Sequence, residues 1–119
     1  MIWLKDASCL GLQTWANALA AANNLADGNQ ACGLTDGSVA GDWRLPNHNE
    51  LTSLLDLGAF NPALPAGHPF TNFVVSYYWS STTVAISSND AWFVGFDNGG
   101  VSGMTKTIQN YVTAVRGGP

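Results

Sequence analysis

The spacing of hydrophobic residues changes along the chain. In the first half, apolar residues recur every three or four positions, which is typical of helices that bury one face. From Tyr77 onward, apolar residues alternate with small or polar ones, which is typical of strands that bury one face. The sequence therefore predicts an α+β domain in which the helices precede the main sheet.

The first helix is expected to begin near Thr14, a residue suited to the N-cap, and to end by Gly28, a natural C-terminal stop. The alanines between these positions favour a helix. Its core-facing stripe comprises Trp15, Leu19, Ala22 and Leu25. Turn signals follow in residues 27–42, so this segment is predicted to be a loop.

A second helix is predicted after Pro46. Asn47 and Glu50 have the spacing of a capping box, in which Asn47 accepts a first-turn amide and Glu50 reaches back to the amide of Asn47. The buried stripe of this helix comprises Leu51, Leu54 and Leu55, and Gly58 is expected to close it. The proline-containing residues 59–72 are predicted to form a long ordered loop.

Short strands are predicted at 2–4, 43–45, 78–82, 92–97, 101–106 and 111–116. In the strand at 92–97, one face is expected to be buried, with Trp92, Val94 and Phe96 on it and Phe93, Gly95 and Asp97 opposite. Asn98-Gly99 predicts a tight hairpin with positive φ at both residues. These elements predict two helices packed on a twisted, mainly antiparallel sheet.

The composition limits the partners. A chain of 119 residues is long enough for a single domain, taken as residues 1–119, but not for two. Charged residues make up only 10% of the chain, and its net charge is −4. Nucleic acid is not an expected partner, and an anionic polysaccharide is disfavoured, because both need clustered basic residues. No apolar run reaches the roughly 18 residues that suggest a membrane span, so direct membrane insertion is not predicted.

Cys9 and Cys32 flank the first predicted helix. A metal or redox pair is the alternative to a disulfide, but their separation fits no compact Cys-x-x-Cys motif, and no histidine lies near either one. A disulfide is therefore predicted, and it implies an extracellular, cell-surface or periplasmic location. The chain opens without a signal-peptide pattern, so we interpret it as a mature domain or a piece of a longer protein.

Short motifs rich in aromatic residues occur in a fixed order. They are Trp3-Leu4, Trp43-Arg44-Leu45-Pro46 with Glu50-Leu51, Tyr78-Trp79-Ser80-Ser81-Thr82, Ala91-Trp92 through Phe96, Lys106, and Val115-Arg116-Gly117-Gly118. Through this ordered set of motifs, the chain resembles the C-terminal domain family of the Legionella collagen-like protein over most of its length. The resemblance implies a C-type lectin-like fold in which Trp3 lies near Val115.

The resemblance also implies a role in binding. It suggests an adhesive or receptor-like module at the cell surface, whose partner is a protein or glycan ligand on another cell or surface. The Legionella relative is associated with sulfated polysaccharide and with trimerisation, but the acidic composition argues against a sulfated ligand here. A structural, trimerising domain of a larger surface protein is the alternative, and it implies a homo-oligomer.

The C-terminal β-rich segment is the expected contact surface. Some C-type lectin-like domains, including members of this family, are variable proteins of diversity-generating retroelements, whose C-terminal segment is mutagenised at adenines. Many polar residues of segment 83–113 are reachable from an Asn codon by such changes, although an ordinary half-exposed sheet also explains the pattern. The candidate ligand-binding residues are Ser87, Ser88, Asn89, Asp90, Phe93, Asp97, Asn98, Ser102, Thr105, Thr107, Gln109, Asn110 and Thr113.

Enzymatic activity is not predicted, and no catalytic residue is assigned. His48 and His68 have no Ser or Cys at a suggestive spacing, and the capping role of Glu50 explains its position. A related Arg-Leu-Pro pattern occurs in formylglycine-generating enzymes. Their chemistry relies on cysteines near the C-terminus, and this chain has none there.

No cofactor and no metal site are predicted. Calcium is the alternative, because it binds clustered oxygen ligands and many lectins of this fold use it. Such clusters occur at Asn89-Asp90, at Asp97-Asn98, and at Asp36 with Ser38 and Asp42. The lectin tripeptides Glu-Pro-Asn and Trp-Asn-Asp are absent, and turn formation explains the Asp-Gly and Asn-Gly pairs.

Overall fold

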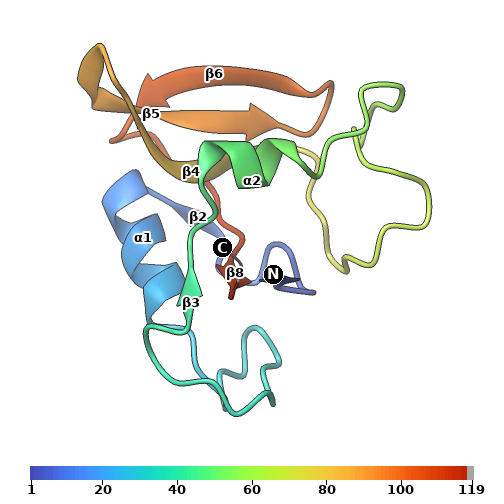
Figure 1. Cartoon of the computed structure of the whole chain (residues 1–119), viewed down its shortest axis with the longest axis vertical. Helices are drawn as coiled ribbons and strands as arrows, with labels where there is room; N and C mark the ends of the chain where they lie inside the picture. Colours follow the sequence, from blue (N-terminus) through green and yellow to red (C-terminus); the bar gives the residue numbers. More distant parts are fainter. Residues whose placement is uncertain (118–119) are drawn as a thin grey trace.

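The computed structural model describes residues 1–117, in which there are two helices and eight strands (Figure 1). The helices are α1 (Trp15–Asn23) and α2 (His48–Thr52). The strands are β1 (Ile2–Trp3), β2 (Leu12–Gln13), β3 (Trp43–Arg44), β4 (Tyr77–Val84), β5 (Ser87–Gly95), β6 (Gly100–Thr105), β7 (Asn110–Tyr111) and β8 (Val115–Arg116). The predicted α+β class is confirmed. Gly118, the last residue of the C-terminal motif, lies outside the described residues.

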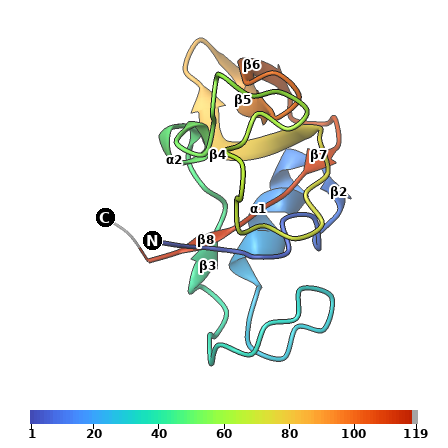
Figure 2. The same ribbon diagram turned by 90° about the vertical axis from the view of Figure 1, so that its right-hand side faces the viewer.

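The strands form two sheets, with the orders β1-β8-β3 and β2-β7-β4-β5-β6. All neighbouring strands are antiparallel except β4 and β7, so the sheets are mainly antiparallel, as predicted. In the smaller sheet, Val115 pairs with both Trp3 and Arg44, and β1 and β8 lie side by side in Figure 2. The predicted proximity of Trp3 and Val115 is confirmed.

The larger sheet is buried on both faces at residues 78–80 of β4 and at the end of β5, which corrects the prediction that this strand has one buried face. Trp79 and Phe93 belong to a core cluster that also contains Ala18 and Ala22 of α1. Tyr78, Val94 and Phe96 belong to a second cluster that contains Leu51 of α2. Because successive side chains of a strand point to opposite faces, the two helices cover opposite sides of β4 and β5.

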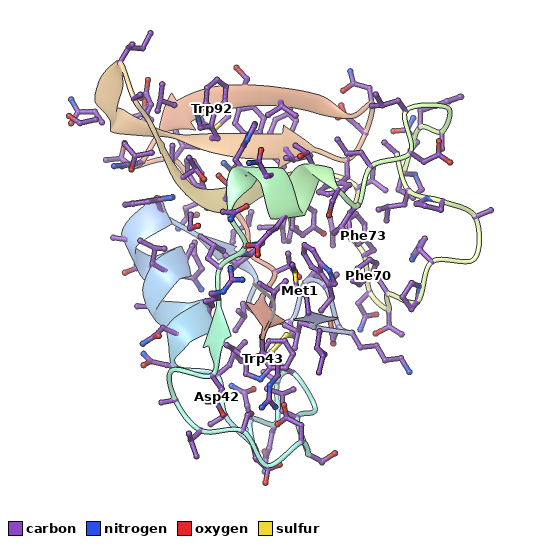
Figure 3. The ribbon with its side chains drawn as sticks, in the orientation of Figure 1. Met1, Asp42, Trp43, Phe70, Phe73 and Trp92 are labelled. Atoms are coloured by element: carbon purple, nitrogen blue, oxygen red, sulfur yellow. A yellow bond between two sulfur atoms is a disulfide. The ribbon has the colours of Figure 1, made fainter. Side chains whose placement is uncertain are left out.

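Trp92 was predicted to face the core, but its side chain is only partly buried. Its ring packs against His48 of α2, with the ring centroids 5.4 Å apart, and Figure 3 shows it on the β5–β6 hairpin. On the same face the second cluster is closed by Phe73, whose ring stacks on Tyr78 at 5.0 Å. The loop after α2 therefore contributes Phe73 to the second cluster.

The motif Tyr78-Trp79-Ser80-Ser81-Thr82 holds the two halves of the chain together through polar contacts. The indole of Trp79 donates to the carbonyl of Gln13 at 2.9 Å, and the indole of Trp15 donates to the carbonyl of Ser80 at 2.9 Å. The Ser80 hydroxyl in turn donates to the carbonyl of Trp92 at 2.7 Å. Polar groups inside a core are costly unless they are paired, so these contacts explain the residue types of the motif.

Both helices end earlier than predicted. The carbonyl of Asn23 accepts the amide of Gly41 from the returning loop, so α1 ends before Leu25, which is nevertheless buried. After α2, the amides of Leu54 and Leu55 bond three residues back, which is a tighter turn than an α-helix.

The C-terminal elements also differ from the prediction. Residues 96–99 join β5 to β6 as a loop in which Gly99 has a φ of +83° while Asn98 has no positive φ. The Asn98 side chain accepts the amide of Gly100 at 2.9 Å, so the turn needs only one left-handed residue. The strand predicted at 111–116 is divided between β7 and β8, which belong to different sheets.

The predicted disulfide between Cys9 and Cys32 is confirmed, with an S–S distance of 2.03 Å. It attaches the loop of residues 24–42 to the segment before α1, and this loop lies at the opposite end of the molecule from β6 in Figure 1. Within residues 1–117, no helix is both long enough and apolar enough to cross a membrane.

The start of α2 is fixed as predicted. The Asn47 side chain accepts the amide of Glu50 at 2.8 Å, and the Glu50 carboxylate accepts the amide of Asn47 at 2.9 Å. Arg44 also forms a bidentate pair with Glu50, at 2.6 and 2.7 Å. Glu50 therefore joins the helix cap to β3, which explains the Arg-Leu-Pro…Glu pattern.

We expect Glu50→Gln to lower the free energy of unfolding by about 1 kcal/mol near neutral pH, since Arg44 is partly exposed and the pair is partly screened. The Arg44 hydrogen bonds hold the pKa of Glu50 below its ordinary 4.5, although burial opposes them. A carboxyl with a lowered folded-state pKa stabilises above the unfolded pKa, and the benefit is lost as pH falls through the folded pKa. Urea unfolding of both proteins should therefore show a difference that shrinks below about pH 4.5. A difference independent of pH would contradict this.

Candidate functional site

A depression of about 180 Å³ opens at the end of the larger sheet where β5 turns into β6. The strand register explains which residues reach it, because Phe93 pairs with Ser102, and Gly95 pairs with both Tyr77 and Gly100. Directly paired residues share a face of the sheet. The lining residues are Tyr77, Phe93, Gly95, Asp97, Asn98, Gly100, Val101 and Ser102.

Two glycines keep the depression open. A Cβ on Gly95 would lie 2.9 Å from Asp97 Oδ1 and 3.0 Å from Tyr77 Cε1, so a side chain there would clash with both. A Cβ on Gly100 would lie 3.1 Å from the side-chain oxygen of Asn98. The backbone of these two strands therefore forms the floor of the depression.

Two aromatic rings form one side of it. The ring of Tyr77 is 40% exposed, and its centroid lies 4.9 Å from that of Phe93 at an interplanar angle of 51°. Phe93 is largely buried and fixes the position of Tyr77 by packing against it. A rigid aromatic side chain with an exposed face contributes contact area at little cost in conformational entropy.

The polar groups of the depression lie on the connecting loop. Asp97 Oδ1 accepts the amide of Asn98 at 2.9 Å, and this turn orients the carboxylate. Within residues 1–117, none of the ion pairs involves Asp97. Of the described residues that line the depression, none is basic. The site therefore offers an aromatic face, one carboxylate, an amide and a hydroxyl.

The family model described as the Lcl C-terminal domain matches residues 1–116. The chain belongs to this family. No curated protein matches the chain. In this Lcl C-terminal domain the motif residues Arg44, Glu50, Trp79 and Ser80 serve the scaffold, through the cap and core contacts described above. The depression lies on the segment that follows these motifs.

Four of the predicted contact residues of this Lcl C-terminal domain meet at the depression, namely Phe93, Asp97, Asn98 and Ser102. Asn98 and Ser102 are exposed, and Asp97 is partly exposed. Phe93 was expected on the outer face, but it is only 9% exposed and packs in the core cluster of α1. The reason is that α1 covers the face of β5 that the sequence pattern assigned to solvent.

Six further predicted residues gather at the other end of the β5–β6 hairpin. Asp90 pairs with Thr105, and the amide of Lys106 donates to the carbonyl of Asn89 at 2.9 Å. The ammonium group of Lys106 lies 4.1 Å from the ring centroid of Trp15 and donates to the carbonyl of Ser88. The six residues are Ser87, Ser88, Asn89, Asp90, Thr105 and Thr107.

The last three predicted residues are divided by burial. Gln109 is exposed, but Asn110 and Thr113 are only 4% and 3% exposed, so they are not surface contact residues. Asn110 donates to the sulfur of Met104 at 3.4 Å, and the Thr113 hydroxyl is buried without a partner. Both residues lie in a segment that packs into the protein, because Val112 and Ala114 beside them belong to the core cluster of α1.

Sequence reasoning missed Tyr77, Gly95 and Gly100 as parts of the site. The signal was present in the strand period, because Tyr77 lies two residues before Trp79 and therefore on the same face as Phe93. What the sequence did not give was the register, which sets Tyr77 opposite Gly95 rather than opposite a larger residue.

The side-chain oxygens of Asp36, Ser38 and Asp42 make contacts within the protein. Arg116 bonds Asp36 at 2.8 Å and approaches Asp42 at 3.8 Å. The Ser38 hydroxyl, with Arg116 beside it, lowers the pKa of Asp36 to about 2 although desolvation opposes them. Across residues 1–117, no group of three or more His, Cys, Asp or Glu side chains is placed to hold a metal ion.

A second hollow is a groove of about 630 Å³ between α1 and the chain that leads from β3 into α2. Half of its lining is alanine and leucine, the rest is Asn23, Arg44, Asn47 and Ser81, and Arg44 is already paired with Glu50. His48 and His68 lie elsewhere and pack against aromatic rings, those of Trp92 and of Phe70 respectively. Among the described lining residues, the groove has neither an aromatic ring nor a carboxylate, whereas the depression has both.

We expect Phe93→Ala to lower the free energy of unfolding by about 3 kcal/mol, because it removes a buried ring from the core cluster. Its Cα partner Ser102 is exposed, so Ser102→Ala should change stability by less than about 0.5 kcal/mol. Chemical denaturation of the two variants is the measurement. Equal, small effects would show that Phe93 is not a core residue.

Proposed function

We propose that this Lcl C-terminal domain is a non-enzymatic ligand-binding module of C-type lectin-like type that acts outside the cell or at its surface. The observation that carries the proposal is the convergence of Asp97, Asn98 and Ser102 on a depression with an exposed aromatic wall. The disulfide between Cys9 and Cys32 is compatible with an oxidising compartment.

The separation of scaffold from surface supports this proposal. The core contacts are made by β4, whose residues 78–80 are fully buried, whereas the polar residues of the depression come from the 96–99 loop and the edge strand β6. The exposed Ser102 of β6 belongs to neither core cluster, although Val101 and Met104 of the same strand pack against them. Binding residues carried on loops above a rigid scaffold are a common arrangement.

Placing a large side chain in the depression should block binding without unfolding the domain. We expect Ser102→Tyr to abolish binding of fluorescent domain to its ligands on a glycan array or in a displayed peptide library. Asn17→Tyr is the matched control, because Asn17 is an exposed polar residue on α1, away from the depression. Thermal unfolding checks both variants. Ligands that bind Ser102→Tyr and wild type equally would place the contact surface elsewhere.

The same separation of roles supports a diversified receptor. If this domain is the variable protein of a diversity-generating retroelement, sequencing of the locus across its source population should show changes at adenines in the codons of exposed residues such as Asn98 and Ser102. The buried Asn110 and Thr113 should stay constant, because changes there disturb the packing around β7. A uniform locus, or variation that includes Tyr78 and Trp79, would contradict diversification.

A further inference from the structure

We propose that the depression binds an organic cation between the ring of Tyr77 and the carboxylate of Asp97. The ligand group would be a lysine or arginine side chain of a partner protein, or a quaternary ammonium head group. This inference rests on the proposed ligand-binding function and names the chemistry that the site selects.

The Asp97 carboxylate and the Tyr77 ring lie next to each other at Gly95. The point where Gly95 would carry a Cβ lies 2.9 Å from Asp97 Oδ1 and 3.0 Å from Tyr77 Cε1, so the carboxylate and the ring border the same space. A cation farther out, at the mouth of the depression, would lie next to both groups. Cations are attracted to an aromatic face when they lie within about 6 Å of the ring centroid. The volume of about 180 Å³ is sufficient for one such head group.

Three of the basic side chains of the domain are engaged away from Asp97. Arg44 is paired with Glu50, and Arg116 lies against Asp36 and Asp42. Lys106 is bonded to Thr83 and Ser88, at the other end of the hairpin. No ion pair within residues 1–117 reaches Asp97, so its charge faces the depression uncompensated by a cation of the chain itself.

Anionic and neutral ligands match the depression less well than a cation does. An anionic group would meet the Asp97 carboxylate and, among the described lining residues, no basic side chain to offset the repulsion. A neutral sugar would stack on Tyr77 and donate hydroxyl hydrogen bonds to the carboxylate, but it carries no charge opposite to that of Asp97. A cation uses the ring and the charge together, and the observations therefore favour it.

The test is an NMR titration of the full ¹⁵N-labelled chain. The cationic probes are choline, Nα-acetyl-lysine methylamide and Nα-acetyl-arginine methylamide. The neutral probes are Nα-acetyl-norleucine methylamide, which matches the lysine stem without its charge, and methyl glucoside. The amides of Gly95 and Gly100 report on the floor of the depression. We expect saturable shifts of these two amides with cationic probes, at millimolar affinity, and none with the norleucine derivative.

Three variants assign the effect to named groups. Asp97→Asn keeps the acceptor for the Asn98 amide and should weaken cation binding about fivefold. Tyr77→Leu removes the ring and should weaken it to a similar extent, whereas Tyr77→Phe should preserve it. Asp56→Asn is the matched control: Asp56 is also half-buried and also caps a turn, at the amide of Gly58, but it does not line the depression. This control removes the same charge and should leave the affinity unchanged.

The outcomes separate this inference from the proposed function. Equal losses in Asp97→Asn and Asp56→Asn would mean general electrostatic attraction and would overturn the cation site. Shifts with methyl glucoside or the norleucine derivative but with no cation would also overturn it, while leaving a ligand site at the depression. Binding of choline alone would assign a quaternary ammonium ligand, and binding of the lysine or arginine probe would assign a basic side chain. If no probe shifts the amide signals of Gly95 or Gly100, the proposed cation site is wrong. The Ser102→Tyr experiment then decides the proposed function separately.

Discussion

The fold depends on one strand that belongs to two cores. Tyr78 and Trp79 are adjacent in β4, yet each is fully buried, one against α2 and the other against α1. A strand in this position exposes neither face, so its polar groups must be paired inside the protein. The bonds of Trp79 to Gln13 and of Ser80 to Trp92 meet that requirement, and they also attach β4 to the N-terminal segment and to β5.

Local chemistry explains which parts of the fold could be predicted. The capping box of Asn47 and Glu50 is a short-range pattern, and the two cysteines of the chain allow a single pairing within it, so the structure contains both the box and the disulfide. Phe93 was predicted to be exposed but is buried, and Trp92 was predicted to be buried but is only partly buried. Both outcomes depend on which helix covers which face of β5. That is decided by the path of the whole chain rather than by the period of one strand.

The candidate site was predicted in part for the same reason. Asp97, Asn98 and Ser102 were found because small polar residues in a hairpin are usually exposed. Tyr77 was missed as a site residue because its place beside Phe93 follows from the pairing of β4 with β5. Asn110 and Thr113 were assigned to the surface by their polarity, although both are buried in a segment whose Val112 and Ala114 belong to the core.

The antiparallel pairing of β1 with β8 has a mechanical consequence. Ile2 pairs with Arg116 and Trp3 pairs with Val115, so the start of β1 and the end of β8 lie at the same end of the sheet. A pulling force applied between the two strands would load these residue pairs one after another, as in a zipper, instead of shearing them together. A tension applied through β8 alone would be shared with β3, which flanks it on the other side. The direction of the load therefore determines how easily this part of the domain opens.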